Sequence, residues 1–150
     1  MHRSTYRQLA ANVVAAAVAL SLAGCGGEKF VIVPVSGVVT VDGKPVEGVH
    51  LTFQPFREDG ADSAGYGAYG VTDAEGRFTL NSITLEGREL PGAVVAKHRI
   101  EMTSAKQVDP SSDLNQFTRE KIPRRYMNEP FIREITGETD SLNFELTTRP

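Results

Sequence analysis

The stretch that decides the fold is residues 35–54, VSGVVTVDGKPVEGVHLTFQ. Within it, residues 35–41 and residues 49–54 each alternate apolar and polar side chains over much of their length. A period of two is typical of a strand with one buried face. Asp42-Gly43 between the two runs is a hairpin signal, because glycine tolerates a positive φ, and Pro45 limits ladder pairing just beyond the turn. The stretch therefore predicts two strands, with a hairpin turn directly after the first.

Similar short alternating runs recur along the chain and are separated by turn signals. The predicted strands are residues 35–41, 49–54, 69–72, 78–80, 94–103 and 142–146, with an extended segment at 122–126. Asp73-Ala-Glu-Gly76 predicts a turn, and no stretch keeps the 3.6-residue apolar period of a helix. The pattern predicts an all-β domain, a seven-stranded antiparallel β-sandwich. Its predicted core is Val39, Val41, Leu51, Phe53, Phe78, Leu80, Ile100, Phe144 and Leu146.

The composition of the 150-residue chain excludes several classes of protein. With 40% hydrophobic and 7% aromatic residues, the chain is too apolar for a disordered tail, and its length allows one small domain. The net charge of −3 argues against a general nucleic-acid binder, which needs a basic face. The single cysteine, Cys25, excludes a disulfide framework and a thiolate metal site.

The N-terminus has the organisation of a secretory signal peptide. Arg3 and Arg7 are its only charged residues before Cys25, and the apolar run 9–22 follows them. Fourteen helical residues span about 21 Å, which is short of the roughly 30 Å hydrocarbon core of a bilayer. A positive start, a short apolar run and small residues after it predict export and cleavage. The expected organisation is a signal peptide over 1–24, a lipidated cysteine and tether over 25–34, and a domain over 35–150.

The small residues before Cys25 point to a lipid anchor. Leu22-Ala-Gly-Cys25 is similar to the bacterial lipobox, in which the peptidase cuts before the cysteine, here between Gly24 and Cys25. The thiol of Cys25 is the nucleophile that accepts the diacylglyceryl group, and two acyl chains already anchor a protein stably. We therefore expect an exported protein held on the cell membrane or the outer membrane. Gly26, in place of the aspartate that retains lipoproteins in the inner membrane, favours the outer membrane.

Three stretches of the chain resemble a known family. VSGVVTVDGKP at 35–45, VHLTFQP at 49–55 and TDAEGRFTL at 72–80 are similar to the carboxypeptidase regulatory-like domain. Residues 97–100, 122–126 and 142–146 resemble its small lipoprotein versions, which are abundant in planctomycete bacteria. The resemblance covers roughly residues 35–147. It implies a transthyretin-like, immunoglobulin-like sandwich of seven strands without catalytic activity. Where the family often has glycine before the segment at Lys97, this chain has Ala96.

Two catalytic or cofactor motifs occur in the sequence without the context they need. Residues 65–70, GYGAYG, match GxGxxG, but no helix is predicted to follow and accept a pyrophosphate. His98-Arg-Ile-Glu101 matches a zinc half-site. On a strand, however, residues three apart point to opposite faces, and no second histidine follows. We expect His98 in the interior or at a sheet end, with one hydrogen-bond partner, and we expect no cofactor, no metal site and no catalytic residue.

Other polar residues have both a structural and a functional interpretation. Asp73 and Glu75 lack the further acidic positions of a calcium loop and are expected in a solvated turn, although a weak calcium site built from loops stays open. Arg124-Arg125 is one basic dipeptide in an acidic domain, and we expect a surface role rather than nucleic-acid binding. His50 and the carboxylates leave acid–base catalysis open, with nothing in the sequence to select a pair.

Tyr66 and Tyr69 are the feature that best fits recognition. They lie in a glycine-rich segment, and exposed tyrosines provide rigid contact area at low entropic cost. A protein or a glycan is the partner they would suit, whereas Tyr69 has the alternative of starting a strand and facing the core. Loops 55–68 and 104–121 are where a binding surface is expected. The sequence thus predicts an envelope lipoprotein with a structural or binding role. The alternative is a carbohydrate- or metal-ion-binding module that acts through the 55–70 loop.

Overall fold

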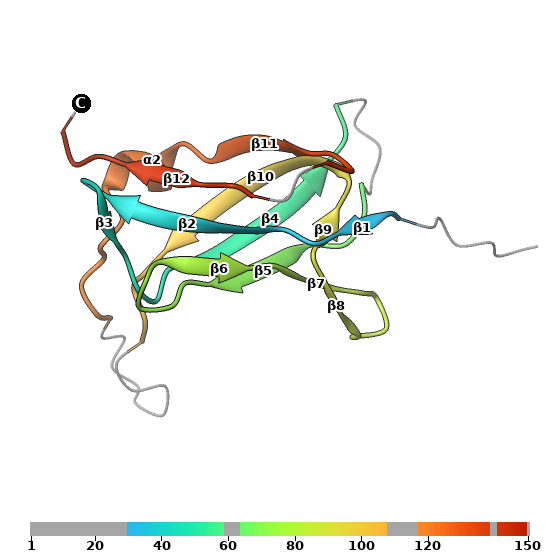
Figure 1. Ribbon diagram of the computed structural model, residues 1–150, viewed down its shortest axis with the longest axis horizontal. Helices are drawn as coiled ribbons and strands as arrows, with labels where there is room; N and C mark the ends of the chain where they lie inside the picture. The colour runs from blue at the N-terminus through green and yellow to red at the C-terminus, as the bar shows by residue number, and fades with distance from the viewer. Residues whose placement is uncertain (1–29, 59–63, 108–116, 139–140, 150) are drawn as a thin grey trace, which may run out of the picture.

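The computed structural model describes residues 30–58, 64–107, 117–138 and 141–149. The described chain is predominantly β-strand, with one short helix (Figure 1). Its elements are β1 (Ile32–Val33), β2 (Ser36–Val41), β3 (Lys44–Pro45), β4 (His50–Phe56), β5 (Ala68–Val71), β6 (Arg77–Thr79), β7 (Asn81–Ile83), β8 (Glu89–Pro91), β9 (Ala93–Val94), β10 (Ala96–Thr103), α2 (Arg124–Asn128), β11 (Phe131–Ile135) and β12 (Phe144–Leu146). The all-β prediction is confirmed.

The strands form one large and two smaller sheets. The large sheet has the strand order β11-β10-β4-β5-β7-β8. In the second sheet, β2 lies between β12 and β3 and also pairs with β6. The third sheet consists of β1 and β9. Every pair is antiparallel except β12 with β2, which is parallel. The prediction of a wholly antiparallel arrangement is therefore wrong at this pair. A parallel neighbour cannot be joined by a tight hairpin, and β12 reaches β2 only after the chain has completed the large sheet.

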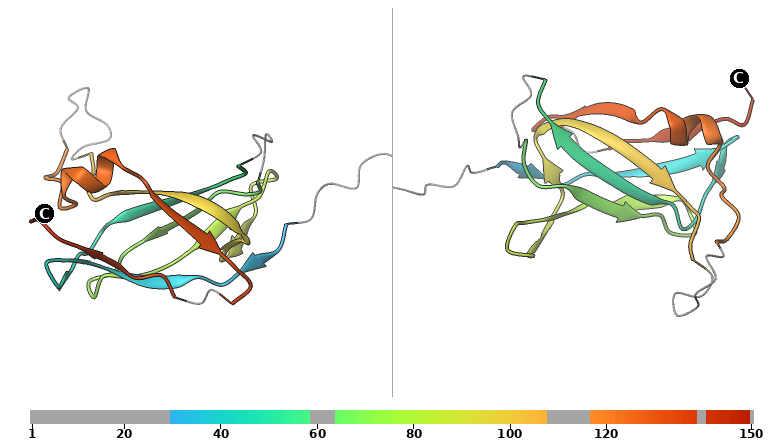
Figure 2. Two further views of the ribbon diagram at one scale, coloured as in Figure 1. Left: turned by 90° about the horizontal axis from the view of Figure 1, so that it is seen from above. Right: turned by 180° about the vertical axis from the view of Figure 1, so that it is seen from behind.

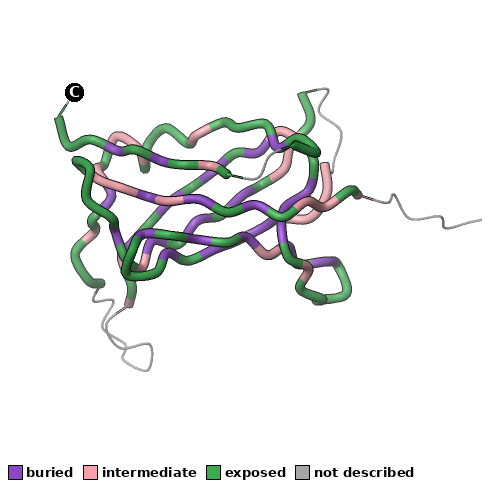
Figure 3. The backbone as a smooth tube through the Cα atoms, in the orientation of Figure 1, coloured by how far each residue is buried: buried purple, intermediate pink, exposed green. Residues whose placement is uncertain are grey.

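The large sheet and the sheet around β2 lie face to face (Figure 2). Buried residues follow the inner faces of the strands (Figure 3). The ring of Phe53 on β4 lies 6.5 Å from that of Phe78 on β6 and 6.4 Å from that of Phe144 on β12. Aromatic pairs at such separations add to the area that they bury. Of the nine predicted core residues, eight are buried and Val41 is half-buried against the core.

The hairpin predicted at residues 42–43 is present. Asp42 and Gly43 both have positive φ, 50° and 75°, and they join β2 to β3. Beyond it, β4 follows the predicted alternation, with Leu51 and Phe53 buried and His50, Thr52 and Gln54 exposed. The period of two thus identified both strands because each has one face in the core.

The predicted strand at 94–103 is divided by Val95. Its first part, β9, pairs with β1, whereas β10 pairs with β4 on one side and β11 on the other. The alternation continues through the break, so His98, Ile100 and Met102 are all buried. The apolar period alone gives no signal of a change of partner.

The extended conformation predicted for residues 122–126 is wrong. Pro123 is the N-cap residue of a short helix, α2. The amide of Tyr126 donates a hydrogen bond to the carbonyl of Pro123. Proline suits the start of a helix, since its missing amide would lack a partner there. Strands β7, β8 and β11 were not predicted, because none of them shows a run of alternating apolar residues. The inward position of β7 is occupied by Ser82, β8 has only the half-buried Leu90, and β11 faces inward only at its two ends, through Phe131 and Ile135. With these strands the described chain exceeds the seven that were expected.

Candidate functional site

The site best supported by the sequence is the predicted lipidation site, and the described part of the chain begins five residues after Cys25. Gly24 and Cys25 lie outside the described residues. Phe30 is the first described residue, and its ring makes an edge-to-face contact with Tyr66 at 5.3 Å. β1 follows it, within the segment expected to be a tether, and pairs with β9. Strand pairing therefore holds the chain to the domain a few residues after Cys25.

Two glycines let this entering segment approach the domain closely. Gly92 has a φ of 108°, and a Cβ at this position would collide with the carbonyl oxygen of Val33. Gly65 has a φ of 126°, and a Cβ there would lie 2.9 Å from Val94 and 3.2 Å from the Phe30 ring. Only glycine adopts such backbone conformations without strain. Gly65 therefore has a structural role, although the sequence drew attention to it as part of GxGxxG.

The two candidate ligand-loop tyrosines have different surroundings. Tyr66 is half-buried against Phe30. Tyr69 lies on β5, between the buried residues Ala68 and Gly70, so its side chain is on the outer face of the sheet and the core-facing alternative is wrong. A hydrogen bond with Glu89 on β8, together with burial, raises the pKa of Tyr69. Both tyrosines are thus engaged with the domain itself.

Beside β1, strands β7 and β8 form a hairpin that projects from the domain (Figure 1). Its turn is closed by the amide of Gly87 donating to the carbonyl of Thr84 at 2.9 Å, and Gly87 has a φ of 75°. Leu85 stands in this turn with 92% of its surface exposed, and Ile83 is 47% exposed. The sequence analysis did not identify this hairpin. The glycine of the Glu86-Gly87 dipeptide is the sequence feature that could have predicted its turn.

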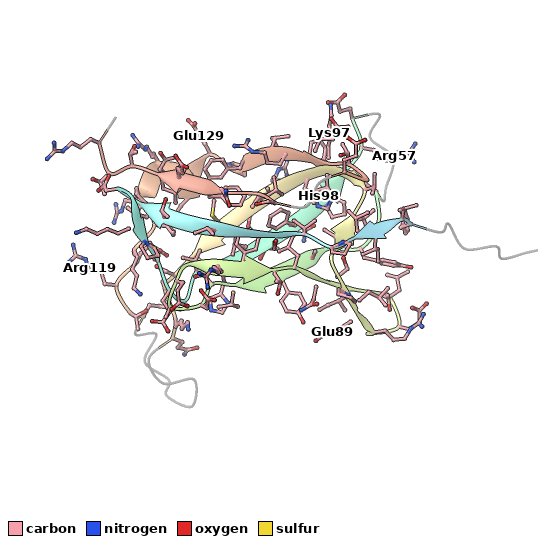
Figure 4. All side chains as sticks on the ribbon, in the orientation of Figure 1. Arg57, Glu89, Lys97, His98, Arg119 and Glu129 are labelled. Atoms are coloured by element: carbon pink, nitrogen blue, oxygen red, sulfur yellow. The ribbon has the colours of Figure 1, made fainter. Side chains whose placement is uncertain are left out.

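His98 and Glu101 do not form a zinc half-site. His98 is fully buried between the sheets, and its Nε2 lies 2.8 Å from the carbonyl oxygen of Val94 (Figure 4). Burial lowers the pKa of His98 against the opposing effect of its backbone hydrogen bonds. Glu101 is exposed on the other face of β10. The predicted interior histidine with a hydrogen-bond partner is confirmed.

The remaining sequence candidates have structural contacts. The carboxylate of Asp73 accepts hydrogen bonds from the amides of Glu75 and Arg77, at 3.0 and 2.8 Å, which stabilises the predicted turn. GxGxxG is followed by β5 and not by a helix. Across the described ranges, no group of three or more His, Cys, Asp or Glu side chains is placed to hold a metal ion. No helix within those ranges has the length and hydropathy to span a bilayer.

Arg125 connects the helix to the C-terminal segment. Its guanidinium lies 4.7 Å from the ring centre of Tyr126, and it donates to the carbonyl and hydroxyl of Thr147 and, at 2.9 Å, to the carbonyl of Arg149. Asp42 accepts from the amide and the hydroxyl of Thr148 in the same segment. These contacts give Arg125 a structural role in holding the C-terminal segment, whereas Arg124 is exposed on the helix.

Glu120, an acidic residue with an extensive set of hydrogen bonds, was missed by the sequence analysis. Its carboxylate accepts hydrogen bonds from the amides of Ser104, Ala105 and Ile122 and from the hydroxyls of Thr103 and Ser104. Burial alone would raise the pKa of Glu120, but these hydrogen bonds lower it to about 2. The carboxylate thereby closes the base of a loop, and nothing in the local sequence shows which donors will surround it.

An open pocket of about 380 Å³ lies beside this network, and Arg119 in its lining is at the end of the domain opposite to β1 (Figures 1 and 4). It is lined in part by Lys106, Arg119 and Lys121, and the ammonium of Lys121 donates to the carbonyl of Glu47 at 3.0 Å. His50, which is exposed, lines a smaller pocket of about 210 Å³ beside Tyr126. The described residues around both pockets come largely from β4, β10 and the adjoining loops.

Comparisons of the chain with protein-family models, with curated proteins and with solved structures found no match.

Proposed function

We propose that this protein is a lipid-anchored component of the bacterial cell envelope whose β-domain has a structural or binding role and no catalytic activity. The observation that carries the proposal is the position of the β1–β9 pair. It holds the chain to one end of the domain only seven residues after Cys25, the cysteine of the lipobox-like sequence. A lipid on Cys25 would hold the domain beside a membrane through a short tether.

The contacts of the chemistry-bearing side chains support a non-catalytic role. His98 is buried against a backbone carbonyl, Asp73 accepts the amides of its own turn, and Glu120 accepts hydrogen bonds from both sides of a loop. A general base needs access to a substrate proton. The Nε2 of His98 and the carboxylates of Asp73 and Glu120 are thus engaged in contacts within the fold.

For the fold family, we propose a carboxypeptidase regulatory-like, transthyretin-like sandwich. The support is the resemblance at 35–45, 49–55 and 72–80, together with two facing β-layers and the hairpin at Asp42-Gly43. The parallel β2–β12 pair and the extra hairpin of β7 and β8 would be variations on that plan. The contacts of Tyr66 and Tyr69 favour a structural role for these residues over a ligand loop.

The test of the anchor is the intact mass and membrane fractionation of the natively expressed chain beside Cys25→Ala. We expect a mature chain that begins at Cys25, carries acyl mass and leaves the membrane only in detergent. Cys25→Ala should lack the modification and keep its N-terminal segment. An unmodified soluble wild-type chain, or a variant that is processed to the same N-terminus and stays membrane-bound, would refute lipidation.

A further inference from the structure

Four of the large apolar side chains that are exposed in the described residues lie next to β1, next to β9, or in the hairpin of β7 and β8. They are Val31, Ile83, Leu85 and Val95, whose exposed fractions are 66%, 47%, 92% and 38%. The amide of Val95 donates to the carbonyl of Val31, and β8 lies beside β1. Figure 1 shows β1, β9 and the β7–β8 hairpin at the same end of the domain. We name these four side chains the anchor-end surface.

We propose that the anchor-end surface contacts the lipid bilayer, with Leu85 inserted into the interface as a second attachment beside the lipid of Cys25. The inference rests on the proposed function, because it takes Cys25 to be lipidated. It adds an orientation: the β7–β8 hairpin faces the membrane, and α2 faces away from it.

The length of the tether supports the lipid surface as the occupant. Cys25 precedes Phe30 by five residues. Because an extended chain spans at most about 3.6 Å per residue, the two Cα atoms are no more than about 18 Å apart. The eight residues of β10 alone span about 26 Å at 3.3 Å per residue. The tether is therefore shorter than the domain, and the end that carries β1 is kept closest to the bilayer.

The shape of the hairpin suits shallow insertion. Leu85 occupies a turn, and nearly all of its surface is exposed although it is one of the most apolar residue types. Burying such a side chain removes it from water at no cost to the core. Tyr66 lies at the same end, beside Phe30, and tyrosine suits a membrane interface because its ring is apolar and its hydroxyl polar.

Two cations near the anchor-end surface are paired with carboxylates, which favours an apolar contact with the bilayer over an electrostatic one. The ammonium of Lys97 lies 2.6 Å from the carboxylate of Glu58, and the guanidinium of Arg88 lies 3.8 Å from that of Glu86 (Figure 4 labels Lys97). Paired cations of this kind add little attraction to anionic lipid headgroups. The proposal therefore predicts contact with a neutral bilayer as well as with an anionic one.

The test places a fluorescent label at two positions of the full, natively processed chain. Leu85→Cys and the control Met127→Cys both introduce a thiol at an exposed apolar position, and Met127 lies on α2 at the opposite end. The chains are labelled with an environment-sensitive fluorophore, reconstituted into phosphatidylcholine vesicles, and exposed to nitroxide quenchers attached at known bilayer depths. Ile83→Cys provides a second label on the hairpin.

We expect the labels at positions 85 and 83 to emit at shorter wavelength than the label at position 127 in the same vesicles and to be quenched by the shallow nitroxide. The label at position 127 should emit at the wavelength of the free fluorophore in water, and anionic lipid should change neither result. Labels at 85 and 127 that are equally exposed to water, on a protein that floats with the vesicles, would overturn the proposal while leaving lipidation intact. If Cys25 carried no lipid, the unsubstituted chain would itself take up the fluorophore and would not float, which would overturn both.

Discussion

Replacement of Glu120 by glutamine is expected to destabilise the domain in a pH-dependent way. The carboxylate accepts hydrogen bonds from the amides of Ser104, Ala105 and Ile122 and from two hydroxyls. A glutamine side chain keeps one acceptor oxygen and places an NH₂ group against the remaining donors. Donors that lose their acceptor are left unsatisfied at a cost of about 1–3 kcal/mol.

The electrostatic contribution of Glu120 to the free energy of unfolding follows from the pKa of its carboxyl group. Burial opposes ionisation, but the hydrogen bonds outweigh it and lower the pKa from 4.5 to about 2. At about 1.4 kcal/mol per pH unit, this shift sets an upper limit of about 3 kcal/mol. The carboxylate is only half-buried, so water screens the interaction and about 1–2 kcal/mol is the more realistic contribution. Because the folded-state pKa is depressed, this contribution is complete above about pH 4.5 and is lost as the pH falls toward 2.

The assay is urea unfolding of the wild type, Glu120→Gln and the control Glu101→Gln at about pH 7 and about pH 2.5. Glu101 is an exposed carboxylate on β10, close in the chain to the Thr103 and Ser104 donors. We expect Glu120→Gln to lower the free energy of unfolding by about 2–4 kcal/mol at neutral pH and by clearly less at the acidic pH. A difference of the same size at both pH values would refute the electrostatic argument, and a loss equal to that of Glu101→Gln would refute the network.

Two further predictions concern His98 and Gly92. Burial lowers the pKa of His98, so the unfolded chain takes up a proton first and stability should fall as the pH drops below 6.5, by at most about 1.4 kcal/mol per pH unit. His98→Gln should remove this slope between about pH 7.5 and 5.5 in urea unfolding, and an unchanged slope would contradict the assignment. Gly92→Ala should displace β1 and abolish the hydrogen-exchange protection of the Val95 amide. Gly87→Ala, which has open space for a Cβ, should cost only about 1–2 kcal/mol of backbone strain and leave that amide protected.

Much of the β-structure was predictable because each strand that was recognised has one face in the core. The alternation at 35–41 and 49–54 identified β2 and β4, and the predicted core residues are buried or packed against the core. The hairpin was predictable because Asp42-Gly43 accepts positive φ at both positions. The interior position of His98 followed from the same period of two.

The candidate site was predictable only in part. The lipidation site at Cys25 is predicted from the sequence alone, because Cys25 lies outside the described residues. The exposed hairpin tip at Leu85 and the hydrogen-bonded carboxylate of Glu120 gave no sequence signal, since one exposed leucine and one loop glutamate are ordinary residues without their neighbours. The sequence marked Tyr66 and Tyr69 as candidates for a ligand loop, but it gave no sign of their partners, Phe30 and Glu89, which come from distant segments.

The sequence by itself determined the local features: the positions of the longer strands, the Asp42-Gly43 turn, the residues of the core and the lipobox-like run before Cys25. Each of these depends on neighbouring residues, through the period of two, a permitted φ or the size of adjacent side chains. Only the tertiary structure decided that β12 runs parallel to β2, that the chain changes partners at Val95, and that Val31, Ile83 and Leu85 belong to elements at one end of the domain. These features depend on contacts between segments far apart in the chain, and a one-dimensional pattern carries no record of which segments meet.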